Sequence, residues 1–503
     1  MEIALSLIPI ALLVVLMAVL KQPGDRSSVI TLTVTAILAL TAFSSSPLEV
    51  ASSFLYGAVK AISPILLIIL MAIFSYNTLL LTGKMEVIKR QFSSISSDRS
   101  IQVLLLTWGF GGLLEAMAGF GTAVAIPAAI LISLGYKPVF SAVVCLVANS
   151  VATAFGAVGT PVIVLAGETG LPVEQLSQAV VLQFCILMLV IPFIIVTLAD
   201  RRRGAVLKNI LLSLAVGGVS LGGQYAAAKT MGPESPAIIG SLLSIIVIIA
   251  AAKIIGRKDS DKDKEDKEQA TTTFTSALSA WSVYALILLL VVFTSPLFPG
   301  IRNALENCLV TTISFPGDEL HPYKIAWLTH AGVLIFIGTV IGGFIQGASA
   351  KGMLSTLWKT TKALRATIVT VICLVGLSTI MDKSGMITVI AGGLAAATGS
   401  LYPLFAPLVG AVGTFVTGSD TSANILFGKM QSTVAGHIGA QPDWLAAANT
   451  VGATGGKIVS PQSIAIATSA CGMSGKEGEI LKSAVPYTLL YIVIAGLTVF
   501  FLG

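Results

Sequence analysis

The sequence predicts an all-α protein that crosses a membrane many times. Of its 503 residues, 55% are hydrophobic and only 11% are charged, a balance that excludes an ordinary soluble domain. Its apolar residues are gathered in runs of roughly 17 to 25, the length that a helix needs to cross the hydrocarbon core of a bilayer. Two stretches of the chain also resemble each other at positions that differ by about 300 residues. Together these observations predict a polytopic helical protein with an internal repeat.

Ten apolar runs are predicted to be spanning helices, at about 3–20, 28–43, 62–81, 175–199, 205–228, 235–255, 276–295, 326–347, 364–381 and 484–502. Two composite regions, about 101–167 and 386–472, are too long for a single span. Each is predicted to hold a helix, a re-entrant hairpin and a broken helix, which gives about 12–14 membrane segments in all. Because Glu2 precedes the first run and Lys21 follows it, we expect a retained helix and not a cleaved signal peptide.

Positively charged residues predict how these helices are oriented. Four clusters are expected on the cytoplasmic side, at Lys84–Arg99, Arg201–Lys208, Arg257–Lys267 and Lys351–Arg365. This assignment places the N-terminus outside and makes helices 62–81 and 364–381 run in opposite directions. We therefore predict two inverted repeats, 1–256 and 274–503, joined by a charged cytoplasmic linker at 257–273.

Glycine and proline interrupt both composite regions at matching places. The tetrapeptide that begins at Gly119 aligns with the one that begins at Gly418, and Ala148–Val151 aligns with Ala448–Val451. In a bilayer, such breaks are tolerated only where the freed backbone groups face protein, substrate, ion or water. The transport-site parts of the two repeats are accordingly predicted at about 101–170 and 386–475.

Three charged residues stand isolated in apolar sequence, namely Glu115, Asp420 and Lys457. A carboxylate within the bilayer costs about 2.5–3.5 kcal/mol, so it usually serves pairing, protonation or ion binding. Glu115 and Asp420 are the candidates for the coupling ion, and Lys457 is the candidate partner of a substrate carboxylate. Structural roles stay open: Asp420 has the context of a helix cap, and Lys457 could pair with an acid or extend to the membrane interface.

Further candidates for substrate binding are the small or polar residues beside the helix breaks. Helix N-terminal amides attract anions there, while freed carbonyls and side chains coordinate cations. Hydrogen bonding between helices is the alternative for any single residue. Their recurrence at matching positions of the two halves favours a site, formed by Gly119, Gly121, Asn149, Ser150, Gly418, Ser419, Thr421, Asn424, Asn449, Ser460 and Gln462.

The sequence contains no motif for metal binding, phosphate binding or catalysis. The five cysteines have no C-x-x-C spacing, and the three histidines have no metal-ligand spacing. The GGK segment around Lys457 is no phosphate loop, since Ile458 stands where a serine or threonine is required. We therefore expect no catalytic residue, metal or cofactor, and no nucleic-acid partner. The lipid bilayer is the expected surrounding.

Four segments of the chain resemble the bacterial lactate permease family. They are EAMAGFG (115–121), FGAVGTPV (155–162), TGSDTSANILFG (417–428) and VSPQSIAIA (459–467). The resemblance implies a carrier, not an enzyme, that moves L-lactate, D-lactate or glycolate together with protons across a bacterial or archaeal cytoplasmic membrane. It also implies an elevator-type movement against an immobile scaffold, for which a homodimer is plausible. A sodium-coupled carboxylate transporter or a cation/proton antiporter of the same wider superfamily is the alternative.

Overall fold

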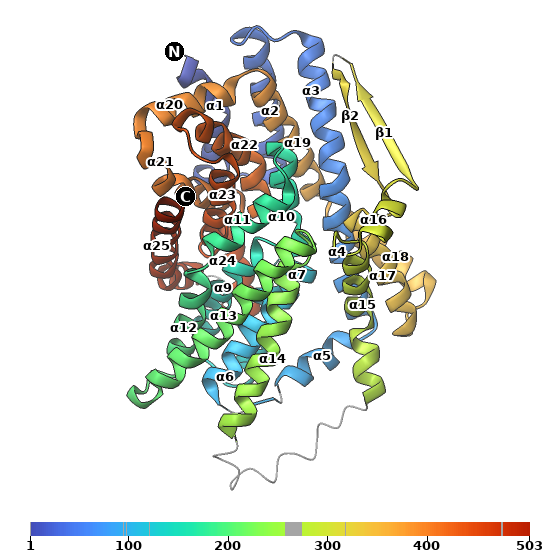
Figure 1. Cartoon of the computed structure of the whole chain (residues 1–503), viewed down its shortest axis with the longest axis vertical. Helices are drawn as coiled ribbons and strands as arrows, with labels where there is room; N and C mark the ends of the chain where they lie inside the picture. The colour runs from blue at the N-terminus through green and yellow to red at the C-terminus, as the bar shows by residue number, and fades with distance from the viewer. Residues whose placement is uncertain are drawn as a thin grey trace.

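The computed structural model of the protein describes residues 2–93, 95–96, 98–119, 121–256, 274–316, 318–473 and 476–503. This part of the chain is mostly helical (Figure 1). Seven of its helices are long and apolar enough to span a membrane, or up to nine if each of two bent pairs is one span. The predicted multi-pass helical architecture is thus confirmed, whereas the total of 12–14 segments stays a prediction. The linker predicted at 257–273 lies outside the described residues.

The chain begins with α1 (Glu2–Val14), η1 (Val15–Val19), α2 (Gly24–Thr41), α3 (Pro47–Lys60), η2 (Ala61–Leu66) and α4 (Leu67–Leu81). The helix predicted at 62–81 therefore begins earlier, at Pro47. A capping box starts it, because Ser46 accepts a hydrogen bond from the Glu49 amide and the Glu49 carboxylate accepts one from the Ser46 amide. The long helix is interrupted at Ser63, whose φ and ψ of −131° and 118° are not helical.

The first composite region folds into α6 (Arg99–Leu104), η3 (Leu105–Phe110), α7 (Gly111–Met117), α8 (Thr122–Ser133), α9 (Pro138–Thr153) and α10 (Gly156–Thr169), preceded by α5 (Lys84–Ser93). The chain breaks between α7 and α8, and it bends by 49° between α9 and α10. The broken helix of the prediction is present as α9 and α10, whereas α6, η3 and α7 form one continuous span, Arg99–Met117, in place of a separate helix before the hairpin. The re-entrant course of the hairpin stays a prediction.

The following segment contains α11 (Val173–Gln183), α12 (Leu187–Ala199), η4 (Arg203–Ala205), α13 (Val206–Thr230) and α14 (Pro236–Gly256). The run predicted as one helix at 175–199 is divided, because α11 and α12 meet at an angle of 46°. The helices α13 and α14 pack against each other and complete the first half of the chain.

The second half begins with α15 (Phe274–Phe293), α16 (Pro299–Glu306), β1 (Val310–Phe315), β2 (Asp318–Ala326), α17 (Ala331–Ile345), α18 (Ala350–Ala363) and α19 (Arg365–Lys383). The strands β1 and β2 form an antiparallel hairpin, so the all-α prediction is wrong in this segment. Its β-branched residues favour a strand, and the Phe315 ring packs against Tyr56 of α3 with 5.1 Å between centroids.

The second composite region folds into α20 (Met386–Thr398), η6 (Gly399–Leu401), α21 (Tyr402–Thr417), α22 (Asp420–Ile438), α23 (Pro442–Lys457) and α24 (Pro461–Ala470), followed by α25 (Glu477–Leu502). Its breaks lie at Gly418–Ser419 and at Ile458–Ser460. The order of elements from α21 to α24 is therefore the order from α7 to α10.

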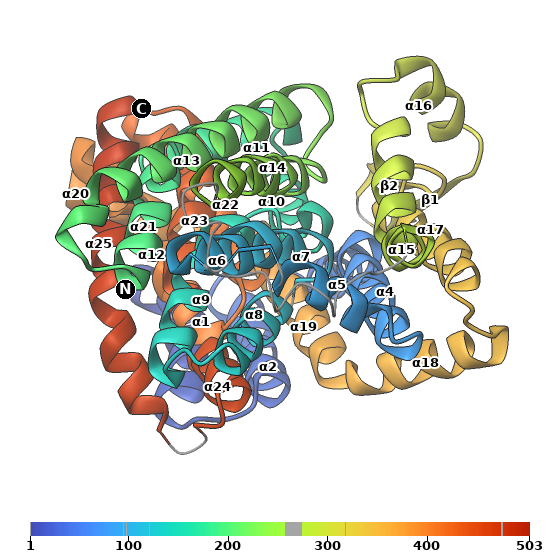
Figure 2. The same cartoon turned by 90° about the horizontal axis from the view of Figure 1, so that it is seen from below.

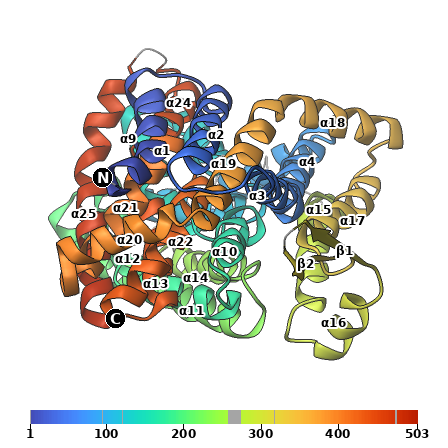
Figure 3. The same cartoon turned by 90° about the horizontal axis from the view of Figure 1, so that it is seen from above.

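Two groups of helices are visible when the molecule is seen from either end (Figures 2 and 3). The smaller group contains α4, α15, α16, α17, α18 and the β-hairpin. The larger group contains both composite regions, and within it the two halves of the chain interlock. The helix α10 packs against α22, and α24 packs against α8. Each broken helix thus lies beside the hairpin of the other half, which brings the two sets of breaks together.

Candidate binding cavity

The first hairpin turns at two glycines that no other residue could replace without strain. Gly119 and Gly121 have φ of 62° and 85°, in the left-handed region that disfavours a side chain. Space is also short at Gly121, since an added Cβ would lie 2.5 Å from Cδ1 of Ile466. The tip of the first hairpin is therefore seated directly on α24.

The second hairpin turns at Gly418, whose φ of 75° is also left-handed. The next residue, Ser419, caps α22 by accepting a hydrogen bond of 3.2 Å from the Ser422 amide. An added Cβ on Gly418 would collide with the Gln462 side chain of α24. Both hairpin tips consequently contact the same short helix.

Three consecutive left-handed residues interrupt the start of α10. Ala157, Val158 and Gly159 have φ of 44°, 55° and 77°, and such values are rare for a β-branched valine. A side chain on Gly159 would collide with the carbonyl of Pro233, in the turn between α13 and α14, so the surrounding structure holds this conformation in place. Strained backbone of this kind is concentrated at functional sites in proteins.

A buried ion pair joins the two composite regions. Nζ of Lys457, at the end of α23, lies 2.8 Å from Oε1 of Glu115 on α7, and it also donates to Thr153 Oγ1 at 3.4 Å. The Glu115 side chain is only 2% exposed, and its Oε2 has no partner among the described residues. An added Cβ on Gly156 would lie 3.0 Å from Oε1, so a glycine is needed there to make room for the carboxylate.

Asp420 is the second buried acid of the region. It is 3% exposed at the first turn of α22, and neither of its carboxylate oxygens has a partner in the part of the chain that the structure describes. An ionised carboxylate without a partner is costly to bury, so this position favours a neutral acid or a bound cation.

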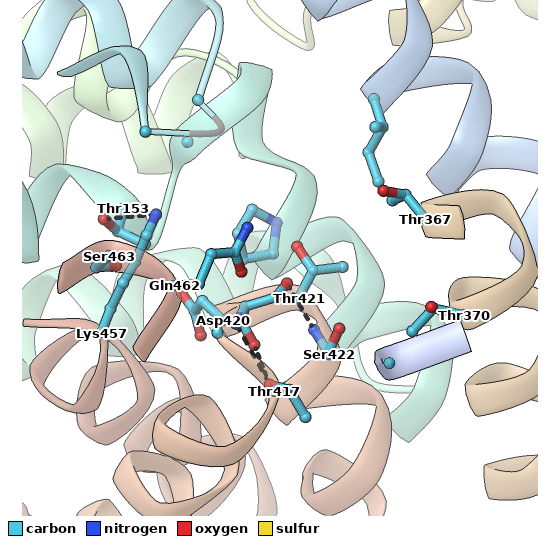
Figure 4. Close-up of a pocket in the computed structure, with 18 of the residues that line it drawn as sticks. Thr153, Thr367, Thr370, Thr417, Asp420, Thr421, Ser422, Lys457, Gln462 and Ser463 are labelled. Atoms are coloured by element: carbon cyan, nitrogen blue, oxygen red, sulfur yellow. Dashed lines mark hydrogen bonds between the residues drawn. The ribbon is translucent and has the colours of Figure 1, made fainter. Parts of the chain in front are cut away.

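These groups line one cavity of about 340 Å³ (Figure 4). Ten of the predicted site residues lie on its wall: Glu115, Gly119, Gly121, Asn149, Gly418, Ser419, Asp420, Thr421, Lys457 and Gln462. Figure 4 shows the Lys457 side chain beside Thr153, with Thr367 and Thr370 of α19 across the cavity from Asp420. The breaks of both halves therefore converge on one space of a size that suits a small ligand.

Four predicted residues do not line this cavity, namely Ser150, Asn424, Asn449 and Ser460. Their polar atoms have protein partners. Asn424 donates to the carbonyl of Pro161 at 3.0 Å, and Asn449 donates to the Asn424 side-chain oxygen at 2.9 Å. Ser150 donates to a carbonyl of its own helix, and Ser460 caps α24. Asn424 and Asn449 thus connect neighbouring helices, whereas the bonds of Ser150 and Ser460 are local to one helix.

Other lining residues were missed by sequence reasoning. Thr153, Thr417, Ser422 and Ser463 lie within a few residues of a predicted ligand, so the helix breaks themselves were a signal for them. No such signal exists for the opposite wall, which α2 and α19 supply through Asp25, Thr367 and Thr370.

The comparisons with known proteins agree with this architecture. The family model described as L-lactate permease matches residues 2–503. An L-lactate permease of Streptococcus iniae is 42% identical over 443 residues, which cover 88% of this chain and 93% of the relative. A glycolate permease of Escherichia coli is 32% identical, with coverage of 98% and 94%.

A similar fold occurs in the crystal structure of the YdaH transporter of Alcanivorax borkumensis, with a TM-score of 0.50 and 13% identity over 90% of this chain and 86% of that one. The relatives are permeases, which are transporters and not enzymes. With the family model matching the chain from end to end, the protein belongs to the L-lactate permease family.

Proposed function

We propose that the protein carries lactate and related small 2-hydroxymonocarboxylates such as glycolate across the cytoplasmic membrane, in symport with protons. The names of its relatives support the substrate class. The cavity is small, and it joins polar groups at the hairpin tips to apolar side chains such as Ile69, Val371 and Leu374. A short acid with one carboxylate, one hydroxyl and a small apolar end has matching chemistry.

The charge of the cavity is the observation that carries this proposal. Its described lining contains the three acids Asp25, Glu115 and Asp420 but only one cation, Lys457. If every group is ionised, an incoming anion meets a net negative wall. Burying like charges together is unfavourable, so anion binding requires that protons or other cations neutralise part of the wall. Coupling of the anion to a cation therefore follows from the composition of the site.

The membrane potential explains why an anion carrier would be coupled to protons. Moving an anion inward against a membrane potential of 100 mV costs about 2.3 kcal/mol per charge, and one proton that moves with the anion cancels this cost. In the proposed site, Lys457 and the N-terminal amides of α22 neutralise the substrate carboxylate, and Glu115 or Asp420 takes the proton.

The finer architecture is also a proposal. The reciprocal packing of α10 with α22 and of α24 with α8 supports two inverted repeats, 1–256 and 274–503. The position of the cavity between the hairpin tips and the helices α2 and α19 supports an elevator movement, in which the two composite regions slide against a scaffold. A homodimer would provide an immobile scaffold.

The test is uptake of labelled L-lactate into proteoliposomes driven by a pH gradient, with and without sodium. We expect uptake without sodium that glycolate inhibits and succinate does not. Sodium-dependent uptake would instead favour a sodium-coupled carboxylate transporter, for which the two unpartnered oxygens of Asp420 are candidate ligands. No uptake of lactate under any gradient would refute the proposed substrate.

Variants of neighbouring residues test the site itself. Replacing Lys457 with alanine is expected to weaken lactate binding strongly, because the carboxylate loses its only cationic partner in the described lining. Replacing Asn149 with alanine should impair uptake, whereas replacing Ser150, the next residue of α9 but outside the lining, should not. Unchanged lactate affinity in Lys457→Ala would exclude the lysine as the carboxylate partner.

A further inference from the structure

The Lys457 ammonium already has an anionic partner in this structure. It lies 2.8 Å from Glu115 Oε1 and 3.4 Å from Thr153 Oγ1, so its charge is compensated before any substrate arrives. A substrate carboxylate that approaches Lys457 would meet the Glu115 carboxylate at the same ammonium. The two anions therefore compete for one cation in a region of low dielectric.

Glu115 is held beside Lys457. Its side chain is 2% exposed, its Oε1 contacts the ammonium, and a Cβ added to Gly156 would lie 3.0 Å from Oε1. A substrate carboxylate that binds Lys457 therefore lies close to Glu115. The unpartnered Oε2 is the atom on which a proton can be placed without breaking the contact between Oε1 and Lys457. A proton on Oε2 removes the charge of Glu115 and leaves the positive charge of Lys457 uncompensated.

From this geometry we infer that the Glu115 carboxylate occupies the place of the substrate anion beside Lys457, and that protonation of Glu115 frees the Lys457 ammonium to bind the substrate carboxylate. The inference rests on the proposed function and assigns the coupling proton to Glu115 rather than to Asp420. With the proton, the buried group of Glu115, Lys457 and substrate is neutral. Without the proton, the same group carries one uncompensated negative charge, which a buried site disfavours.

The other titratable groups at the cavity do not fulfil this role. Asp25 lines it from α2 and Asp420 from α22, whereas α8, α9, α10 and α14, which pack against α7, add no titratable side chain to the described lining. Neither Asp25 nor Asp420 has a described ion pair with Lys457. Protonation of either acid would reduce the negative charge of the wall but would release no cation for the substrate.

The test measures binding of labelled L-lactate to the purified full-length protein in detergent, from about pH 5.5 to about pH 8.5. In the wild type, the Kd is expected to rise toward the alkaline end of this range, with a limiting slope of about tenfold per pH unit, as linkage to one proton requires. In Glu115→Gln, the Kd should change less than about twofold across the range. In the matched control Asp420→Asn, the wild-type slope should remain.

The outcomes separate this inference from the proposed function. If Glu115→Gln keeps the wild-type slope, or if Asp420→Asn loses it, the inference is overturned while lactate binding stands. If the wild type binds neither lactate nor glycolate at any pH, the proposed function is refuted, and the inference with it.

A measurement on the wild type alone covers the case in which Glu115→Gln does not fold. With a pH indicator in weak buffer near pH 8, each lactate bound should take up about one proton from solution. Lactate binding without proton uptake would overturn the inference.

Discussion

A second buried ion pair allows a quantitative test of how α3 and α10 are held together. Lys60 at the end of α3 lies 3.1 Å from Glu168 of α10, and the two side chains are 11% and 4% exposed. Ser378 of α19 donates to the other Glu168 oxygen at 3.2 Å. At this distance the attraction is about 5 kcal/mol for an effective dielectric constant of 20, most of which offsets desolvation.

Breaking this pair from one side should therefore cost more than removing it entirely. We expect Lys60→Met to lower the free energy of unfolding by about 3–5 kcal/mol, because Glu168 is left as an uncompensated buried charge. The double variant Lys60→Met, Glu168→Gln should recover at least half of that loss. The more exposed pair of Lys89 and Glu86, 3.0 Å apart, provides the control, and Lys89→Met should cost less than about 1 kcal/mol.

The assay is equilibrium unfolding of the four proteins in one detergent, followed by circular dichroism. Reversibility is checked by refolding, so that the differences are free energies. The reasoning would be refuted if the double variant were less stable than Lys60→Met, or if Lys60→Met cost no more than Lys89→Met. Either result would mean that the buried charges are solvated or that other partners compensate them.

Two further predictions concern the hairpin tip and the turn that holds α10. Gly121→Ala should abolish most lactate uptake, because the added Cβ would displace Ile466. Gly135 is the control: its φ is also left-handed, but an added Cβ would have no atom within 4 Å. Gly135→Ala should therefore keep uptake and lower the free energy of unfolding by only about 1–2 kcal/mol. Burial raises the pKa of Glu234 from 4.5 to about 7, so the stability from its neutral form is complete below pH 4.5 and is lost as the pH rises through about 7. Between pH 4.5 and pH 7, the free energy of unfolding of the wild type should fall by about 2 kcal/mol, a figure already reduced to allow for the partial exposure of the side chain. Glu234→Gln should show little loss over the same range, and thermal unfolding at the two pH values measures the difference.

The sequence predicted the multi-pass helical character and the breaks of both composite regions because both depend on local composition. Apolar runs of sufficient length can only be helices in lipid, and glycine and proline mark where such helices stop. The β-hairpin could have been predicted from its β-branched residues, although the aromatic contact with Tyr56 that anchors it joins residues about 260 positions apart. The start of α3 could also have been found from the capping box at Ser46 and Glu49.

Only those residues of the candidate site that stand out in the local sequence could be predicted. Isolated charges identified Glu115, Asp420 and Lys457, but no local pattern shows that Lys457 pairs with Glu115, 342 residues away, and leaves Asp420 without a partner. Asn149 and Asn449 also occupy matching positions, yet one lines the cavity and the other bonds to a neighbouring helix. Tertiary packing decides this difference.

The proposed internal repeat has a chemical asymmetry that bears on the proposed coupling. Ala157 stands at the repeat position of Lys457, and a neutral residue, Thr414 or Phe415, stands at that of Glu115. The backbone breaks are thus present twice, whereas the ion pair is present once and takes one member from each half. A cavity formed by two similar halves would otherwise offer two equivalent sites for anion and proton. Because only one cation lines it in the described chain, the second half serves to complete the first site instead of forming another. For the proposed symport, this asymmetry favours a stoichiometry of one anion and one Glu115-bound proton per cycle.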